Sequence, residues 1–88
     1  MKTRSVVVRD GQGLHLRVAG AVVNAARRFQ AAVQLRDGAE RSANAHSILE
    51  VLLLGAQAGA ELEVVAEGPD ESEVVDALAE LFENGGGI

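Results

Sequence analysis

His15 and Arg17 are the residues of this chain whose types and spacing best suit chemistry on an anion. They belong to the stretch Gly13-Leu14-His15-Leu16-Arg17, where a glycine-bounded loop gives way to a sequence with helical period. The first turn of a helix has unpaired backbone N–H groups and the positive end of the helix dipole, so it attracts anions. A histidine there has a nucleophilic ring nitrogen near neutral pH, and an arginine fork can reach phosphate oxygens. The spacing therefore suits a phosphoryl group carried on His15.

A histidine near the start of a helix also has a more ordinary explanation. Most such side chains are surface residues or local caps rather than nucleophiles. The residue chemistry of His15, taken alone, leaves both explanations open.

Composition excludes several other classes of function. The chain has 88 residues, no cysteine and only two histidines, so we expect no disulfide, no metal site and no cofactor. Its net charge of −5 argues against nucleic acid, which proteins bind mainly through Lys and Arg. No apolar run approaches the roughly 20 residues of a membrane-spanning helix, and residues 1–4 lead into a strand without an apolar leader. We therefore expect a cytoplasmic monomer with a single domain over residues 1–88 and no membrane insertion.

The elements that must position His15 follow from the hydrophobic period. Short alternating or β-branched stretches predict strands over residues 5–9, 31–36, 40–43 and 61–67. Apolar residues at three- and four-residue steps predict helices from Leu16 to about Phe29, over 47–54 and from Asp70 to 83. Residues 84–88 are expected to form a frayed tail. The order βαββαβα predicts a two-layer α+β domain, but the period does not distinguish a ferredoxin-like strand order from another open-faced sandwich.

Two of the predicted helices begin with the sequence of a capping box. Ser47 with Glu50, and Asp70 with Glu73, have the spacing in which each side chain accepts a backbone N–H from the other end of the box. His46, directly before the first of these boxes, is expected to be a solvated side chain.

The stretch Gly13-Leu14-His15-Leu16-Arg17-Val18-Ala19 resembles the Gly-Leu-His-x-Arg-Pro-Ala signature of the HPr family. These proteins are the histidine phosphocarriers of the phosphoenolpyruvate-dependent sugar phosphotransferase system. Residues 47–55 and 66–71 resemble the second helix and the last strand with the third-helix start, so the similarity covers nearly the whole chain. The resemblance implies an open-faced two-layer sandwich with a four-stranded antiparallel sheet, in order 1-4-2-3, and three helices on one face.

The same resemblance implies a stoichiometric phosphocarrier rather than an enzyme. His15 would accept a phosphoryl group on Nδ1 from phosphorylated enzyme I and pass it to an EIIA-type domain, while Arg17 clamps the phosphate. One departure is Val18, which stands where the family has proline: it restores a backbone donor but loosens the first turn of the helix. A docking patch around His15 would consist of Leu16, Gly20, Ile48, Val51 and Leu52, although core packing explains part of so apolar a helix equally well.

Ser47 matches the serine that HPr kinase/phosphorylase modifies in HPr proteins of many Gram-positive bacteria. Glu50 departs from that pattern, which has glycine there, and capping alone would account for the serine. An alternative of another class is a non-transporting HPr-like regulatory module that binds a transcription factor or an enzyme. His15 and Arg17 favour the carrier, whereas Val18 and Glu50 leave room for the module. A ferredoxin-like domain for a small ligand has no positive signal in the sequence.

Overall fold

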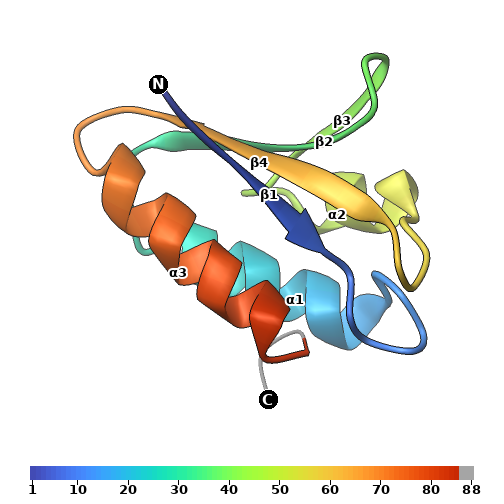
Figure 1. Ribbon diagram of the computed structural model, residues 1–88. Coiled ribbons are helices and arrows are strands. Elements are labelled where there is room, and N and C mark those ends of the chain that lie inside the picture. The colour runs from blue at the N-terminus through green and yellow to red at the C-terminus, as the bar shows by residue number, and fades with distance from the viewer. Residues whose placement is uncertain (86–88) are drawn as a thin grey trace.

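The computed structural model describes residues 1–85 and contains four strands and three helices (Figure 1). The strands are β1 (Lys2–Val7), β2 (Ala32–Asp37), β3 (Arg41–Asn44) and β4 (Glu61–Glu67). The helices are α1 (Leu16–Ala26), α2 (Ile48–Leu54) and α3 (Glu71–Glu83). This order confirms the succession of elements that the hydrophobic period predicts. Within residues 1–85, none of the helices combines the length and the apolar character needed to cross a membrane.

Strand β1 differs most from the expected bounds, because it begins at Lys2 and ends before the expected residue 9. Its pairing with β4 explains the early start: the register sets Lys2 opposite Ala66 and Val7 opposite Glu61. A paired backbone extends the strand through polar residues that give no apolar alternation. Val8 then leaves the ladder, although its N–H still donates to the Ala60 carbonyl at 2.9 Å.

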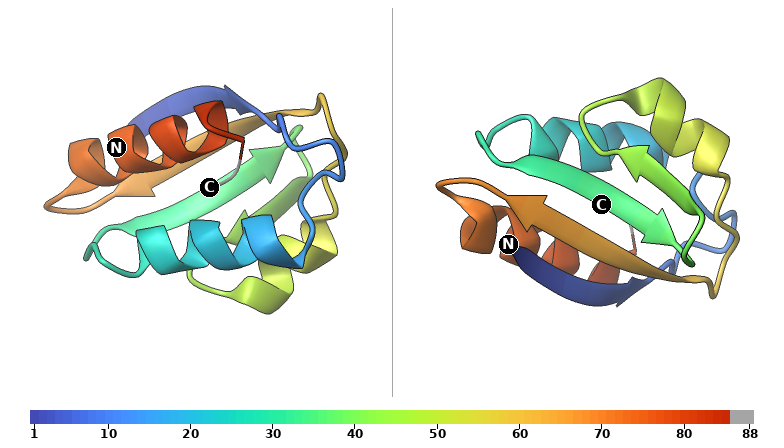
Figure 2. Two further views of the ribbon diagram at one scale, coloured as in Figure 1. Left: turned by 90° about the horizontal axis from the view of Figure 1, so that it is seen from below. Right: turned by 90° about the horizontal axis from the view of Figure 1, so that it is seen from above.

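The four strands form one antiparallel sheet in the order β1-β4-β2-β3. All three helices lie on the same face of this sheet, and the opposite face is uncovered (Figure 2). Helices α1 and α3 lie side by side across the sheet, while α2 lies against β3 (Figure 1). This is the open-faced two-layer sandwich that the resemblance implied.

A largely aliphatic core fills the space between the sheet and the helices. From the strands, Val33, Leu35 and Val64 are at most 1% exposed. From α3, Leu78 is fully buried and Phe82 is 2% exposed. Burying side chains of this size contributes roughly 1.5–3 kcal/mol each before the entropy of ordering them is subtracted. Val22 of α1 is fully buried in the same core, so packing fixes the position of α1 and with it the position of its N-terminus.

The capping box predicted between Asp70 and Glu73 is wrong. Asp70 is the N-cap of α3, but its carboxylate accepts the N–H groups of Gln30 at 2.9 Å and Ala31 at 2.8 Å. The N–H of Gln30 is the main cause that lowers the pKa of Asp70, and the N–H of Ala31 adds to it. Because Ala31 is buried, its amide needs a protein partner, and Asp70 supplies one from a segment that is distant in sequence.

Glu71 holds the start of α3 instead. Its Oε1 accepts the Gly68 N–H at 3.1 Å, and its Oε2 lies 3.0 Å from the ammonium group of Met1. The Met1 ammonium is the first cause that lowers the pKa of Glu71, followed by the Gly68 N–H. This pair connects the beginning of β1 to the beginning of α3.

The last turn of α3 is closed by two backbone hydrogen bonds. The Asn84 N–H donates to the Glu80 carbonyl at 3.1 Å, and the Gly85 N–H donates to the Phe82 carbonyl at 3.2 Å. Gly85 has a φ of 78°, the left-handed conformation that often ends a helix. Of the tail expected over 84–88, residues 86–88 lie outside the described residues.

We predict that Asp70→Ala destabilises the fold at neutral pH. The buried Ala31 N–H would then lack a partner, which costs about 1–3 kcal/mol. Because the folded pKa of Asp70 lies below its unfolded value of about 3.9, its contribution is complete above that pH and is lost as the pH falls through the lowered pKa. Urea melts of wild type and variant at several pH values measure the difference.

The control for this prediction is Asp76→Ala on the same helix, whose side chain is 77% exposed. Its effect should stay within about 0.5 kcal/mol. A loss at Asp70 no greater than at Asp76, or one that is the same at pH 2 and pH 7, contradicts the role given to the Asp70 carboxylate.

Candidate functional site

His15 is the N-cap of α1, at the point where the loop after β1 turns into the helix. Its backbone is extended (φ −86°, ψ −179°), and its Nδ1 accepts the backbone N–H of Arg17 at 3.3 Å. The His15 carbonyl accepts the Ala19 N–H at 2.9 Å, which closes the first turn. Nδ1 therefore faces the end of the helix that attracts anions. The side chain is 28% exposed, so another protein can reach the ring.

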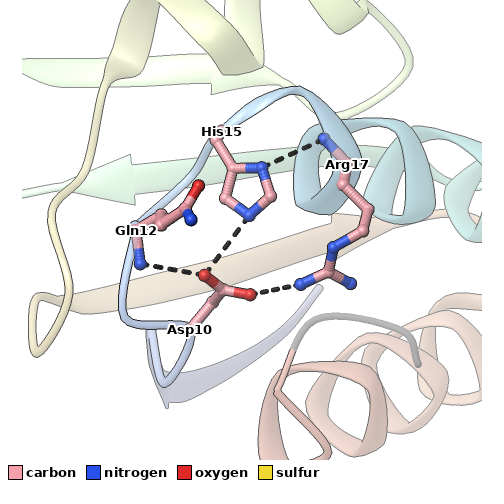
Figure 3. A network of polar contacts seen from close by, with 4 residues as sticks. All are labelled: Asp10, Gln12, His15 and Arg17. Atoms are coloured by element: carbon pink, nitrogen blue, oxygen red, sulfur yellow. Dashed lines mark hydrogen bonds and ion pairs between the residues drawn. The ribbon is translucent and has the colours of Figure 1, made fainter.

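Asp10 joins His15 and Arg17 into one network, and the sequence analysis did not single it out (Figure 3). Its Oδ1 lies 3.3 Å from Nε2 of His15, and its Oδ2 pairs with the guanidinium of Arg17. Oδ1 also accepts the Gln12 N–H at 2.9 Å. This N–H is the largest cause that lowers the pKa of Asp10, and His15 and Arg17 lower it further. The carboxylate is therefore ionised at neutral pH.

A local signal for part of this arrangement exists in the sequence. An aspartate that accepts the N–H two residues ahead forms an Asx-turn, and Asp10-Gly11-Gln12 has a composition typical of such turns. The turn predicts the contact with Gln12. It does not predict the contacts with His15 and Arg17, because these depend on where the loop carries the carboxylate.

The contacts of the His15 ring select one tautomer. Nδ1 accepts a hydrogen bond and so carries no proton, whereas Nε2 faces a carboxylate and so donates. The nitrogen with an available lone pair is therefore Nδ1. Its bond to the Arg17 amide is long, so an incoming electrophile can displace it at small cost.

The loop that carries His15 is fixed against the connection between α2 and β4. The Leu14 N–H donates to the Ala56 carbonyl at 2.9 Å, and the Leu14 side chain is only 5% exposed. Gly13 has a φ of +76°, and a Cβ there would lie 2.7 Å from the Ala56 oxygen. Both the left-handed backbone and the close approach require glycine at this position.

Ser47 is the N-cap of α2, and one half of the predicted capping box is confirmed. Its Oγ accepts the Glu50 N–H at 3.3 Å. The reciprocal half is wrong, because the Glu50 carboxylate accepts the N–H of Asn44 at 2.9 Å rather than that of Ser47. Asn44 ends the edge strand β3, where outward amides have no neighbouring strand to pair with. The Ser47 N–H donates to the Asn44 carbonyl at 3.0 Å instead.

The expectation of a solvated His46 side chain is only partly confirmed, because the residue is half-buried. Its Nε2 is buried and has no hydrogen-bond partner among residues 1–85. The His46 carbonyl accepts two bonds from the Arg27 guanidinium, at 3.2 and 3.0 Å. Since Arg27 follows directly after α1, these bonds connect the end of α1 to the start of α2.

Only some of the five residues expected in a docking patch lie together on the surface. Leu16 is 65% and Ile48 is 38% exposed, and a Cβ added at Gly20 would meet Ile48 Cδ1 at 4.0 Å. Leu16 and Gly20 are four residues apart on one helix, so these three residues lie on neighbouring surface. Val51 is wrong as a patch residue, because it is 0% exposed and belongs to the core. Leu52 is partly buried against that core.

Leu49 and Leu53 are exposed apolar side chains that the sequence analysis did not single out. They are 64% and 73% exposed, respectively. Every residue of α2 except Glu50 is Ile, Leu or Val, so the sequence offers no polar positions that mark its outer face. Leu53 lines a shallow depression together with Glu40 and Arg41 at the β2–β3 hairpin.

Several known proteins are similar to this chain in sequence and in fold. A family model described as "PTS HPr component phosphorylation site" matches residues 2–84. The phosphocarrier protein HPr of Treponema pallidum (strain Nichols) is 40% identical over 84 residues, which are 96% of this chain and 94% of the relative. The phosphocarrier protein NPr of Proteus mirabilis (strain HI4320) is 34% identical over 82 residues, 93% of this chain and 91% of the relative. The crystal structure of HPr-C-His from Thermoanaerobacter tengcongensis has a TM-score of 0.93 and 32% identity, and covers 100% of this chain and 98% of that one.

We predict that Ser47→Ala lowers the free energy of unfolding by about 0.5–2 kcal/mol, because the Glu50 N–H loses its acceptor. Ser47→Asp should be tolerated, since aspartate also caps helices. Urea melts of both variants measure these effects.

Ser72→Ala is the matched control, because Ser72 is an exposed serine in the first turn of α3. Its removal should change stability by no more than about 0.5 kcal/mol. Equal effects of the two alanine substitutions would mean that Ser47 contributes nothing as a cap.

Proposed function

Because this chain belongs to the HPr family of phosphocarrier proteins, we propose that it carries a phosphoryl group on Nδ1 of His15. The observation that carries this proposal is the position of Nδ1, which accepts the Arg17 amide at the N-terminus of α1. A phosphoryl group on that nitrogen would lie against the unpaired N–H groups of the first turn. The protein would act stoichiometrically, being phosphorylated and dephosphorylated once in each cycle.

We propose enzyme I, phosphorylated from phosphoenolpyruvate, as the donor. The lone pair of Nδ1 attacks the phosphorus atom, so the Nδ1–P bond forms while the bond from phosphorus to the donor breaks and its electrons return to the donor. Nε2 keeps its proton, so the ring becomes positively charged. The reverse chemistry passes the group to an EIIA-type domain. Phosphoryl transfer depends mostly on positioning and charge stabilisation, so a small carrier is sufficient.

Arg17 is suited to clamp the phosphoryl group. Its side chain is 49% exposed, and its guanidinium pairs with Asp10 on the same side of the loop as the His15 ring. A half-exposed arginine can turn toward a new anion without disturbing the core. Its planar fork then offers paired donors to phosphate oxygens.

Val18 occupies the position of the family proline and supports the site in a different way. Its side chain is 1% exposed, so the first turn of α1 is anchored in the core even without the proline ring. Its N–H adds a donor that proline lacks. Both features favour retention of the anion site.

We propose that partners dock on the surface formed by Leu16, Gly20 and Ile48, next to the His15 loop. Leu16 directly follows His15, and the exposed apolar area continues to Ile48. Exposed apolar patches of this kind commonly mark protein-binding sites. The surface would receive enzyme I and EIIA-type domains in turn.

For Ser47 we propose capping as the principal role, because its Oγ already accepts the Glu50 N–H. If HPr kinase/phosphorylase also modifies Ser47, the added charge should oppose docking of a phosphorylated donor. Ser47→Asp should then slow phosphoryl transfer from enzyme I. Transfer at the wild-type rate in a stable Ser47→Asp variant would leave only the cap.

We predict that His15 is the only residue labelled by enzyme I and phosphoenolpyruvate. Mass spectrometry should find one acid-labile phosphoryl group on the wild-type protein and none on His15→Ala. His46→Ala is the matched control and should be labelled like wild type. No label on the wild type with enzyme I from several bacteria would favour the regulatory module, and a label that persists in His15→Ala would exclude this residue.

We also predict that Arg17→Ala folds normally but transfers phosphate slowly. An exposed ion pair contributes at most about 1 kcal/mol to folding, whereas one charge-assisted contact to the phosphoryl group contributes about 1.5–3 kcal/mol, or ten- to a hundredfold in rate. Arg28→Ala removes an exposed arginine beyond the far end of α1 and should transfer normally. Wild-type transfer rates in Arg17→Ala would refute the clamp.

A further inference from the structure

We propose that Asp10 is the positioning residue of the phosphoacceptor site. Its carboxylate holds the His15 ring with Nδ1 toward α1 and keeps Arg17 beside the ring until a phosphoryl group arrives. This inference rests on the proposed role of His15 and assigns a role to a residue outside the His-x-Arg motif.

The turn around Asp10 is rigid enough to position another side chain. The Asp10 side chain is 14% exposed, and its Oδ1 accepts the Gln12 N–H. Its backbone carbonyl accepts the Gly13 N–H at 2.9 Å, and Gly13 lies directly against Ala56. Side chain and backbone of Asp10 are thus both fixed, and the lowered pKa keeps the carboxylate charged. A fixed charge of this kind can orient a mobile ring.

The effect on His15 follows from the contact of 3.3 Å between Oδ1 and Nε2. A ring flipped about its last torsion would turn a carbon toward the carboxylate and lose the contact between Nε2 and Oδ1, so the carboxylate favours the orientation with Nδ1 toward the helix. The ring becomes positively charged when Nδ1 forms its bond to phosphorus. The ionised carboxylate then stabilises the developing charge without taking the proton, as the aspartate of a Ser-His-Asp triad does.

The effect on Arg17 follows from competition between anions. In the unphosphorylated protein the guanidinium pairs with the single negative charge of Asp10. A phosphoryl group carries up to two negative charges and three acceptor oxygens, so it competes strongly for the same fork. Asp10 therefore keeps Arg17 next to the ring in the unphosphorylated protein. In the phosphorylated protein, Arg17 leaves Asp10 and binds the phosphoryl group.

The test compares Asp10→Ala, which removes the acceptor and the charge, with Asp10→Asn, which keeps an acceptor oxygen for Gln12 and Nε2–H. Two quantities are measured: the tautomer of the His15 ring by 15N NMR of the unphosphorylated protein, and the single-turnover rate of labelling by enzyme I. We expect Asp10→Ala to populate the Nε2–H tautomer less than wild type, because only the long contact from the Arg17 amide then favours it, and to be labelled about ten- to a hundredfold more slowly. Asp10→Asn should keep the tautomer and lose less of the rate.

The matched control is Asp37→Ala, which breaks another carboxylate–arginine pair, with Arg41 at 3.4 Å, at the β2–β3 hairpin. It should change neither quantity. An unchanged tautomer in Asp10→Ala overturns the proposal even if labelling slows, because a merely structural role would slow labelling without affecting the ring. If wild type takes no label, the function proposed for His15 fails, and the NMR measurement still decides whether Asp10 positions the ring.

Discussion

The sheet has a single apolar face, and the position of every functional residue depends on how that face is covered. Inward side chains such as Leu35 and Val64 belong to the same buried core as residues of α1 and α3, while the other face is left without helices. Because α1 lies across the covered face of the sheet, its N-terminus lies near the end of β1. There Leu14 is buried and bonded to Ala56, so a residue as exposed as His15 is carried by a rigid support.

Carboxylates hold several of the connections between elements. Asp70 accepts amides from the chain before β2, Glu50 accepts the amide of Asn44, and Asp10 accepts that of Gln12. In each case a carboxylate oxygen accepts a backbone N–H at a connection between elements. The acidic balance of the chain, with a net charge of −5, thus partly reflects structure rather than a preference for a basic partner.

Local contacts likewise hold together the residues of the proposed phosphoacceptor site. His15, Arg17 and Asp10 all lie in or beside one loop, so a small domain needs no enclosed cavity to bring them together (Figure 3). Their partial exposure suits the proposed transfer of a phosphoryl group from one protein to another. The geometry of the site therefore depends on a few local contacts. One of these is the close approach of Gly13 to Ala56, which leaves no room for a Cβ at Gly13.

The sequence by itself determined the elements and the core of the site, because both depend on short spacings. Alternation and helical period identified the strands and helices of residues 1–85, and they placed His15 and Arg17 two residues apart at a helix start, beside the backbone N–H groups of its first turn. The strand order was predicted only from the resemblance to the HPr family, because the hydrophobic period does not indicate which strands pair.

Only the tertiary structure decided which of several competing partners each group takes. Asp70 and Glu50 belong to sequences with the spacing of capping boxes, but their carboxylates accept amides outside those boxes, from Ala31 and from Asn44 at the end of β3. Val51 and Leu53 are equally apolar in sequence, and only packing buries the first and exposes the second. Asp10 reaches the ring of His15 because the intervening turn folds back. Local spacing determines what lies within one helical turn, whereas burial and competition for donors depend on segments that only the folded core brings together.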